Sequence, residues 1–412
     1  MKKYNFEYFA SCPMGLEELL SQEILSAGAK STKIVRGGVQ FECFHEVALK
    51  VIVQTRFASR VFKYLYSMDV LHEKDYYLEA TEIPWKNLMH HAQTFRLTTI
   101  FADLPQDREE FRNSQFVNLK LKDAICDFFR HFDGTRPSVE KEFPDITFLA
   151  RVERGDKKPY SVTLMYDLCG DPLNQRGYRI AKTEAPVKEN VAAGLLRLAN
   201  WNPEEEGLLD AMCGSGTILI EAALIAGNIP PGYLKVERHL TNRGMAMWTF
   251  LNYPWFVEDK ALQDSFKVIC DEVKVQTDVG MKKLEAMKGR IRGSDIDSYN
   301  VGVAQDNLQK ARLLNVIPLE RKDALETTPP AEKSLFISNP PYGERLEHGE
   351  EEKLKALYKG LGDHWKHNWK GQRAALFTGN LAMLKVVGLR TSKKTILWNG
   401  DIECRLAEYN LY

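Results

Sequence analysis

The residues best suited to chemistry stand in a short run of Asn, two prolines and Tyr that follows the apolar stretch Phe336–Ser338. Proline has no amide hydrogen and a fixed φ, so the carbonyl groups of this run point outward without a competing donor. The Asn339 side-chain oxygen and the Pro340 carbonyl can therefore accept both hydrogens of an amino group on a nucleic-acid base, and Tyr342 offers a ring face for that base. We predict that the catalytic residues are Asn339, Pro340, Pro341 and Tyr342.

An amino group of this kind is a poor nucleophile, because its lone pair is conjugated into the ring of the base. Positioning of the nitrogen against an activated methyl group, rather than a strong base or a metal ion, would supply the catalysis. A target base inside paired nucleic acid would also have to be flipped out of the stack. The alternative interpretation is a proline-rich turn that only ends a buried strand.

A second candidate site is the turn at residues 210–217, where an acidic residue precedes a short Gly-Ser-Gly. Its spacing is neither the dinucleotide pattern G-x-G-x-x-G nor a phosphate-binding loop, which would need Gly-Lys-Ser or Gly-Lys-Thr. An acid at the end of a strand, before a tight glycine turn, suits a cofactor with an amino-acid part, because Asp210 can hold its ammonium group. A purely structural turn is the alternative. The cofactor-binding residues that we predict in this turn are Asp210, Met212, Cys213, Gly214, Ser215, Gly216 and Thr217.

Three more acids lie further along the chain. Asp295 can accept two hydrogen bonds from ribose hydroxyl groups, whereas Asp297 suits the N-cap of the next helix. Asp323 could accept from an adenine amino group or be an exposed loop acid. In dinucleotide folds the ribose-binding acid lies about 20 residues beyond the glycine turn, and a long insertion accounts for the larger separation in this chain. Together these acids and the turn predict S-adenosyl-L-methionine as the cofactor, with the further binding residues Asp295, Ile296, Asp323, Ala324 and Asn339.

The sequence predicts no metal site. His90-His91 and the pair His364 and His367 lack a neighbouring cluster of acids or cysteines, so surface or packing roles are favoured for them. The seven cysteines are scattered singly, which indicates reduced thiols rather than disulfides or zinc ligands. Cys213 could be a nucleophile, but its place inside the cofactor turn favours packing.

The composition is ordinary for a globular protein, and 412 residues are enough for two or three domains. Because the sequence has neither a run of eighteen apolar residues nor the apolar segment of a signal peptide, we expect a cytoplasmic protein that does not bind a membrane. The 56 basic residues balance the 56 acidic ones, and residues 1–165 are balanced as well, with 23 of each. Charge therefore gives no support for nucleic-acid binding, and nothing in the sequence defines the oligomeric state.

The second half of the chain alternates predicted strands and helices, which is typical of a doubly wound α/β fold with a mostly parallel sheet. Near the end, Asn399-Gly400 stands between two strand-like runs and predicts an antiparallel hairpin at one edge of that sheet. The predicted strands are 207–210, 288–294, 335–338, 374–378 and 395–397, and the predicted helices are 186–199, 217–226, 299–314 and 350–365.

The first 168 residues suggest one or two small α+β units. Helices are predicted at 14–27, at 113–132 and at 45–54 with a continuation toward Arg60; strands are predicted at 33–35, 39–43 and 95–102, with a hairpin of 146–154 and 159–168. Residues 228–288 are long for a connection and rich in aromatic side chains. These could stack on bases, but packing of an inserted helix onto the sheet is the favoured interpretation.

The motifs at 210–217, 293–297 and 339–342, in this order, resemble the Rossmann-like class I methyltransferases that act on exocyclic amines. Four N-terminal segments are similar to the THUMP RNA-binding domain: Thr55–Arg60, Arg112–Phe116, Lys120–Ala124 and Arg136-Pro137. Residues 176–179 and 184–189 resemble the linker of the RlmL-like enzymes, and Asn339–Leu346 resembles their catalytic loop. The resemblance runs from about Tyr4 to Tyr412 and covers the first half of the fused bacterial enzymes.

This resemblance implies an enzyme that forms N(2)-methylguanosine in large-subunit ribosomal RNA. It also implies three parts: a ferredoxin-like α+β unit (residues 1–55), a THUMP domain (56–168) and a Rossmann-fold methyltransferase domain (169–412). The RNA-binding residues that it suggests are Arg56, Arg60, Asn113, Lys120, Lys122 and Arg136, although the arginines and lysines could equally be solvated surface charges. Two alternatives remain: an adenine-specific DNA methyltransferase, which shares the amine motif, and a non-catalytic RNA-binding assembly factor.

Overall fold

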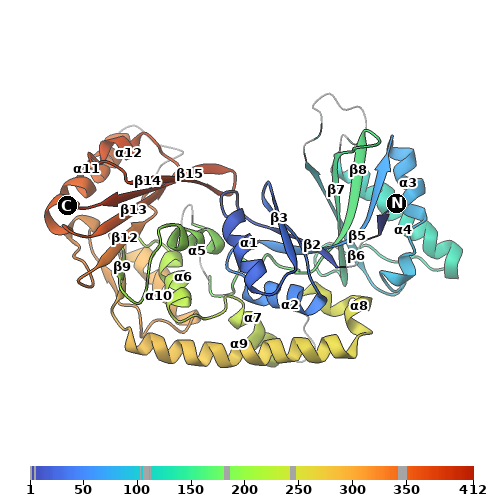
Figure 1. Cartoon of the computed structure of the whole chain (residues 1–412), viewed down its shortest axis with the longest axis horizontal. Coiled ribbons are helices and arrows are strands. Elements are labelled where there is room, and N and C mark those ends of the chain that lie inside the picture. Colours follow the sequence, from blue (N-terminus) through green and yellow to red (C-terminus); the bar gives the residue numbers. More distant parts are fainter. Residues whose placement is uncertain are drawn as a thin grey trace.

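The computed structural model describes residues 2–3, 6–102, 104, 111, 113–180, 186–241, 247–341 and 350–412. They form two modules, each built on its own β-sheet (Figure 1). We call residues 2–168 the N-terminal module, residues 186–412 the C-terminal module and residues 169–180 the linker.

The C-terminal module contains a seven-stranded sheet in the order β11-β10-β9-β12-β13-β15-β14. The first five of these strands run parallel, whereas β15 is antiparallel to both of its neighbours. The doubly wound fold with a C-terminal hairpin is therefore confirmed. The strands are β9 (Gly207–Asp210), β10 (Ile291–Asp295), β11 (Leu319–Arg321), β12 (Ser334–Ser338), β13 (Arg373–Thr378), β14 (Lys393–Asn399) and β15 (Ile402–Asn410).

Continuous apolar runs in these strands reflect burial on both faces of the sheet, as parallel sheets require. In β12, Leu335 and Ile337 join one core cluster, while Phe336 between them joins a second cluster on the opposite face. Helices cover both faces and supply the rest of each core. The first core includes side chains of α5 (Glu189–Leu198), α6 (Thr217–Ala226) and α10 (Ser298–Lys310), and the second includes those of α11 (Glu350–Asn368) and α12 (Met383–Val386).

The C-terminal hairpin turns where the sequence predicts it. Asn399 pairs with Ile402, so the two-residue loop is Gly400-Asp401. Gly400 has a φ of 69°, a conformation that two-residue hairpin loops need and that glycine adopts without strain.

The N-terminal module contains an eight-stranded sheet in the order β3-β4-β2-β5-β8-β7-β6, with β1 also paired to β5. Strand β5 pairs with β2 on one side and β8 on the other, so a single sheet joins the two halves of this module. The strands are β1 (Lys2–Lys3), β2 (Glu7–Ser11), β3 (Ser31–Val35), β4 (Gly38–Glu42), β5 (Arg60–Val70), β6 (Phe95–Ala102), β7 (Ile146–Arg154) and β8 (Tyr160–Asp167). The helices are α1 (Glu17–Ser26), α2 (His45–Gln54), α3 (Glu73–Thr81), η1 (Trp85–Asn87) and α4 (Ser114–Asp133).

The prediction that the second helix continues toward Arg60 is wrong. Helix α2 ends at Gln54, and Thr55 adopts an extended conformation. The Thr55 hydroxyl accepts hydrogen bonds from the amides of Phe57 and Ala58. A local side-chain turn of this kind competes with helix, and it sends the chain directly into β5.

The segment between β9 and β10 that follows α6 contains an inserted helix, as predicted, but the contacts of this helix are mainly with other helices, among them α2 and α6, and not with the sheet. Its aromatic residues Trp248, Phe250, Tyr253 and Phe256 are buried, so they are not available to stack on bases. The long helix α9 lies along both modules and contacts α2 of one and α6 of the other (Figure 1). The helices of this segment are α7 (Tyr233–Thr241), η2 (Thr249–Asn252), α8 (Pro254–Val257) and α9 (Lys260–Ala286).

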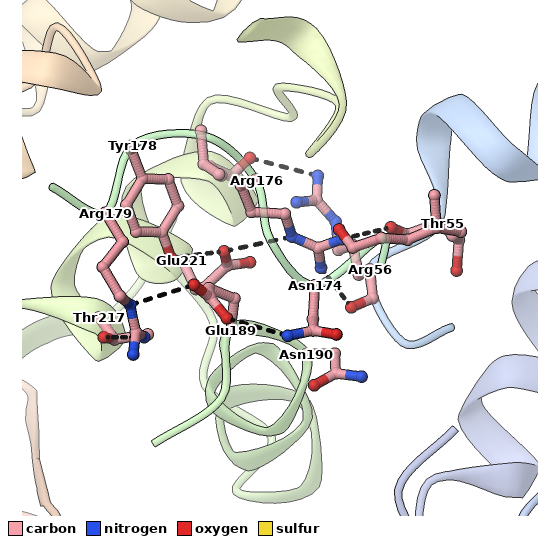
Figure 2. A network of polar contacts seen from close by, with 12 residues as sticks. Thr55, Arg56, Asn174, Arg176, Tyr178, Arg179, Glu189, Asn190, Thr217 and Glu221 are labelled. Atoms are coloured by element: carbon pink, nitrogen blue, oxygen red, sulfur yellow. Dashed lines mark hydrogen bonds and ion pairs between the residues drawn. The ribbon is translucent and has the colours of Figure 1, made fainter. Parts of the chain in front are cut away.

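A buried network of charged side chains joins the modules through the linker (Figure 2). At its centre, Arg176 is 2% exposed and Glu221 of α6 is fully buried. Arg176 donates to the carbonyl oxygens of Thr55 (3.2 Å), Arg56 (2.5 Å) and Leu173 (2.8 Å). Its Nε lies 3.6 Å from Glu221 Oε1, which also accepts from the Tyr178 hydroxyl at 3.0 Å. Burial raises the pKa of Glu221, whereas Arg176 and Arg56 lower it.

Two further side chains, Arg56 and Asn190, connect the two modules directly. The Arg56 guanidinium reaches across and donates to the carbonyl oxygens of Leu224 (3.2 Å) and Ile229 (2.9 Å). In the other direction, the Asn190 amide in α5 donates to the Phe57 carbonyl and the Ser59 hydroxyl. The linker and both modules therefore share one set of polar contacts.

Within the described ranges no helix is both long and apolar enough to cross a membrane. All seven cysteines are buried thiols.

Replacing Arg176 by Met should destabilise the protein, because in a buried site Glu221 loses an ion-pair partner and three carbonyl oxygens lose a donor. Removing one partner of a buried ion pair costs about 3–5 kcal/mol, so we expect a loss of that size in the free energy of unfolding, measured by urea denaturation. Arg312→Met is the matched control, because Arg312 pairs with Glu237 at 3.1 Å where both side chains are about half exposed. It should cost about 1 kcal/mol or less. Equal losses for both variants would contradict this account of the network.

Candidate active site

The predicted site residues meet at the carboxyl edge of the C-terminal sheet. Asp210, Asp295 and Ser338 end the neighbouring parallel strands β9, β10 and β12, and Asn339 directly follows β12. Gly293 pairs with Asp210, so Asp295 lies two residues further along the sheet than Asp210, on the same carboxyl side. Ligands of open α/β sheets bind at this edge.

The turn between β9 and α6 depends on its two glycines. Gly214 and Gly216 have φ values of 52° and 77°, which side chains rarely adopt. A Cβ atom on Gly216 would also lie 3.3 Å from the Ala304 side chain of α10. The turn is tied to β10 by two hydrogen bonds, from the Cys213 amide to the Ser294 carbonyl and from the Gly214 amide to Asp295 Oδ2, both at 3.0 Å.

Asp210 is a buried carboxyl group at the base of this turn, only 1% exposed. Its Oδ1 accepts from the Ser338 hydroxyl at 2.7 Å and from the Met212 amide at 3.3 Å. Burial raises the pKa of Asp210 to about 7, against the effect of these two hydrogen bonds and with a smaller contribution from Asp295. The side chain therefore gains or loses a proton near neutral pH unless a cation binds beside it.

Asp295 performs a structural task that the sequence does not indicate. Besides the Gly214 amide, it accepts from the Asp297 amide (3.0 Å) and from the Asn300 side chain (3.3 Å). A carboxylate offers about four acceptor positions, so one remains for a ligand. The Ile296 side chain beside it is 63% exposed and gives this edge an apolar surface. Asp297 caps α10 as predicted, by accepting from the Tyr299 amide.

Asn339 presents a buried acceptor. In the part of the chain that the structure describes, Asn339 Oδ1 has no hydrogen-bond partner. A buried polar atom without a partner costs free energy, and this one belongs to the side chain from which a contact to a substrate amine is predicted. Pro340 is buried and Pro341 is exposed. Tyr342 lies outside the described residues.

The third acid of the edge follows β11. Asp323 Oδ1 caps η3 (Ala324–Glu326) by accepting from the Leu325 amide at 2.9 Å. The Lys322 amide donates to the Asp295 carbonyl at 3.0 Å and holds this loop against β10. Ala324 is buried in the second core cluster. Asp323 thus lies at the carboxyl edge of the sheet, where its Oδ1 already accepts the hydrogen bond from Leu325.

Three residues that the sequence analysis did not select support the turn. Ser338 bridges two strands, because its hydroxyl donates to Asp210 and accepts from the Ala211 amide. Asn307 of α10 donates to the Ser215 carbonyl, and Arg179 of the linker donates to the Thr217 hydroxyl, both at 2.9 Å. Ser338 adjoins the Asn-Pro-Pro run and could have been suspected, whereas nothing in the sequence links Asn307 or Arg179 to the turn.

The Cys213 thiol is not suited to act as a nucleophile. It is buried, and desolvation together with the charges of Asp210 and Asp295 raises its pKa well above the usual value. A thiol is a weak nucleophile in such surroundings. The structure agrees with the packing role favoured from the sequence.

The six predicted RNA-binding residues do not form one surface. Arg56 is engaged in the network described above, and Arg60 forms an ion pair with Asp167 and donates to the Gly170 carbonyl, so we no longer propose either as an RNA ligand. Asn113 caps α4, in which Lys120 lies over the Phe116 ring and Lys122 pairs with Asp123. Arg136 is exposed beyond the far end of α4, about 20 Å of helix from Lys120 at 1.5 Å per residue.

Metal binding has no support in the described parts of the chain, because no group of three or more His, Cys, Asp and Glu side chains is arranged to hold an ion. His364 is instead engaged with the Thr327 carbonyl and the Asn368 side chain.

Comparison with protein families gives three matches along the chain. An RMKL-like methyltransferase domain matches residues 176–408, an RlmL ferredoxin-like domain matches residues 7–62 and a THUMP domain matches residues 72–156.

The similar proteins include two bacterial methyltransferases and one protein of known structure. Ribosomal RNA large subunit methyltransferase K/L of Cellvibrio japonicus is 36% identical over 98% of this chain and 51% of its own length. The protein of the same name from Psychromonas ingrahamii is 37% identical over 98% of this chain and 50% of its own. The chain thus spans about half the length of the curated relatives that it matches. SMU.472, whose crystal structure contains SAH (S-adenosylhomocysteine), is 26% identical, with a TM-score of 0.79 over 100% of this chain and 99% of its own.

Replacing Gly216 by Ala should destabilise the turn, because an L-residue at positive φ costs about 1–2 kcal/mol and its Cβ would press on Ala304. We expect a loss of this size in the free energy of unfolding. Gly302→Ala is the control, because Gly302 lies inside α10 and its Cβ would meet no atom within 4 Å. Alanine should stabilise that helix by up to about 1 kcal/mol. If Gly216→Ala left the free energy of unfolding unchanged, the turn would not need a left-handed backbone conformation at this residue.

Proposed function

Because this chain belongs to the RMKL-like methyltransferase family, we propose that it is an RNA methyltransferase that uses S-adenosylmethionine to methylate an exocyclic amino group. The observation that carries this proposal is the buried Asn339 Oδ1 at the carboxyl edge of the sheet, which lacks a partner in the described structure. An acceptor of this kind suits a substrate that brings its own N–H donor.

The residues at the edge fit the cofactor. S-adenosylmethionine supplies a methyl group on a sulfonium sulfur. Asp210 would hold its ammonium group, because a buried carboxyl with a raised pKa is stabilised as a carboxylate by a neighbouring cation. The Asp295 carboxylate would accept from one ribose hydroxyl group through its remaining acceptor position, and Ile296 and Asp323 would contact the adenine. SAH in the similar structure of SMU.472 supports the choice of cofactor.

The substrate amine would be held by acceptors alone. Asn339 Oδ1 would accept one hydrogen of the amino group and the Pro340 carbonyl the other, which turns the nitrogen lone pair toward the methyl group. The cofactor would supply the methyl group, with the C–S bond breaking as the N–C bond formed, and the methylated nitrogen would release a proton to solvent. This arrangement uses positioning rather than a strong base. Tyr342 is proposed as the stacking surface for the base.

RNA is the proposed substrate because a THUMP domain model matches residues 72–156 and because both relatives are named for large-subunit ribosomal RNA. We propose N2 of guanine in that RNA as the target. This choice depends on the likeness to the RlmL-like enzymes, since the acceptor pair at residues 339 and 340 suits the amino group of adenine as well.

The test is to incubate the protein with radiolabelled S-adenosylmethionine and with ribosomal RNA from a strain that lacks the corresponding gene. Label should appear in N(2)-methylguanosine, identified by mass spectrometry. Asn339→Ala should lower kcat by about 10²–10³-fold, the usual cost of losing one positioned polar group. Asn368→Ala is the control, because Asn368 lies at the end of α11, next to the opposite edge of the sheet. Label found only in adenine of duplex DNA would replace RNA by DNA as the substrate.

Cofactor affinity should depend on pH through Asp210. Since the pKa of Asp210 is raised to about 7 in the free protein, this carboxyl is protonated at lower pH and cannot pair with an ammonium group. We therefore expect the Kd for SAH to rise as the pH falls below about 7, by at most about tenfold per pH unit. Calorimetry across this range tests the expectation. Asp210→Asn should bind more weakly and without this pH dependence; an unchanged pH dependence in the variant would assign the titration to another group.

A further inference from the structure

The Gly214–Thr217 turn is held on its outer side by a residue from the linker. Arg179 Nη2 donates to the Thr217 hydroxyl and to the Val187 carbonyl, both at 2.9 Å, and its Nε lies 3.2 Å from Glu189 Oε1 (Figure 2). The Thr217 hydroxyl also lies 3.1 Å from the Ser215 hydroxyl. Arg179 therefore orients two hydroxyl groups of the turn at once.

The same end of the linker reaches the turn by a second route. The Ile180 amide donates to Asn307 Oδ1 at 2.9 Å, and the Asn307 side-chain amide donates to the Ser215 carbonyl at 2.9 Å. Asn307 is 1% exposed, so this relay is shielded from water. Two consecutive linker residues thus hold the turn from two directions.

The turn needs this support because its own sequence provides little. The residue at the N-cap of α6 is Gly216, which has no side chain to accept from the first amides of the helix. Two glycines with positive φ make the loop compact, but they also allow its backbone to adopt other conformations. A fixed donor on Thr217, the first residue of the helix, restricts this freedom.

Arg179 is itself held by the contacts that join the modules. Three residues before it, Arg176 is anchored on carbonyl oxygens of the N-terminal module and on Glu221. Tyr178, directly before it, donates to the same Glu221, which lies one turn beyond Thr217 in α6. The linker therefore binds α6 at both Thr217 and Glu221. Because Arg176 also binds carbonyl oxygens of the N-terminal module, the position of the linker depends on that module.

We propose that Arg179 is a positioning residue for the cofactor, which acts through Thr217 to fix the Gly214–Thr217 turn in its binding conformation. This inference rests on the proposed function, in which that turn binds S-adenosylmethionine. The N-terminal module then contributes to cofactor affinity through the linker, although it provides none of the residues that contact the cofactor.

The experiment measures SAH binding to the full chain by calorimetry, together with the thermal midpoint of each variant. Arg179→Met should weaken SAH binding about tenfold, as expected for the loss of one charge-assisted hydrogen bond. Arg179→Lys should recover part of the affinity. The matched control is Arg373→Met, because Arg373 forms a comparable forked pair with Glu206 and donates to the Ala199 carbonyl at the opposite end of the sheet. It should lower the thermal midpoint and leave SAH affinity unchanged within about twofold.

A double-mutant cycle tests the route through Thr217. Thr217→Val removes the acceptor with little change in shape, and Arg179→Met added to it should weaken binding little further. The proposal is overturned if Arg179→Met binds SAH as tightly as the wild type, if Arg373→Met weakens binding equally, or if the two effects in the cycle multiply. Failure of the wild-type protein to bind SAH would instead reject the proposed function. Arg179→Lys and Thr217→Val keep the test decisive if Arg179→Met does not fold.

Discussion

Glu221 carries a carboxyl group into the interior at the place where the two modules meet. A buried charge of this kind is tolerated only where cations and hydrogen-bond donors surround it. Arg176 and Arg56 provide the cations, and the Tyr178 hydroxyl provides a donor. Because these side chains come from the linker and from the residues just after α2, their interactions with Glu221 also fix how the modules are joined. The position of α6, and hence of the turn before it, depends on this arrangement.

At the sheet edge, the cost of burying polar groups without partners favours ligand binding instead of the joining of modules. Within the described residues, Asp210 and Asn339 Oδ1 are buried polar groups whose charge and hydrogen-bonding capacity are only partly matched by neighbouring groups. The two groups are complementary to a cation and to an N–H donor, so a ligand that brings both would relieve both. The supporting residues Ser338, Asn307 and Asp295 have their hydrogen bonds within the fold. Stability is thus maintained around the site while its central acceptors remain available.

Much of the C-terminal module could be predicted from sequence because its signals are local. The alternation of predicted strands and helices indicated the parallel sheet, and Asn399-Gly400 indicated the hairpin. The roles of Arg179 and Asn307 could not be predicted, since each acts on a turn that is distant from it in the sequence. Strand β5 was missed because the helical pattern of α2 runs up to it, and only the Thr55 turn separates them. Likewise, nothing in the sequence around Arg56 distinguishes it from a surface arginine. Only the fold shows that its guanidinium makes an internal contact.

Helix α9 has a consequence for the order of events during synthesis. The N-terminal module leaves the ribosome first, but the helix against which α2 packs is made roughly two hundred residues later. Until residues 260–286 emerge, the outer side of α2 lacks its partner. The nascent chain therefore passes through a stage in which the N-terminal module carries an uncovered surface on α2 that is open to association with other chains.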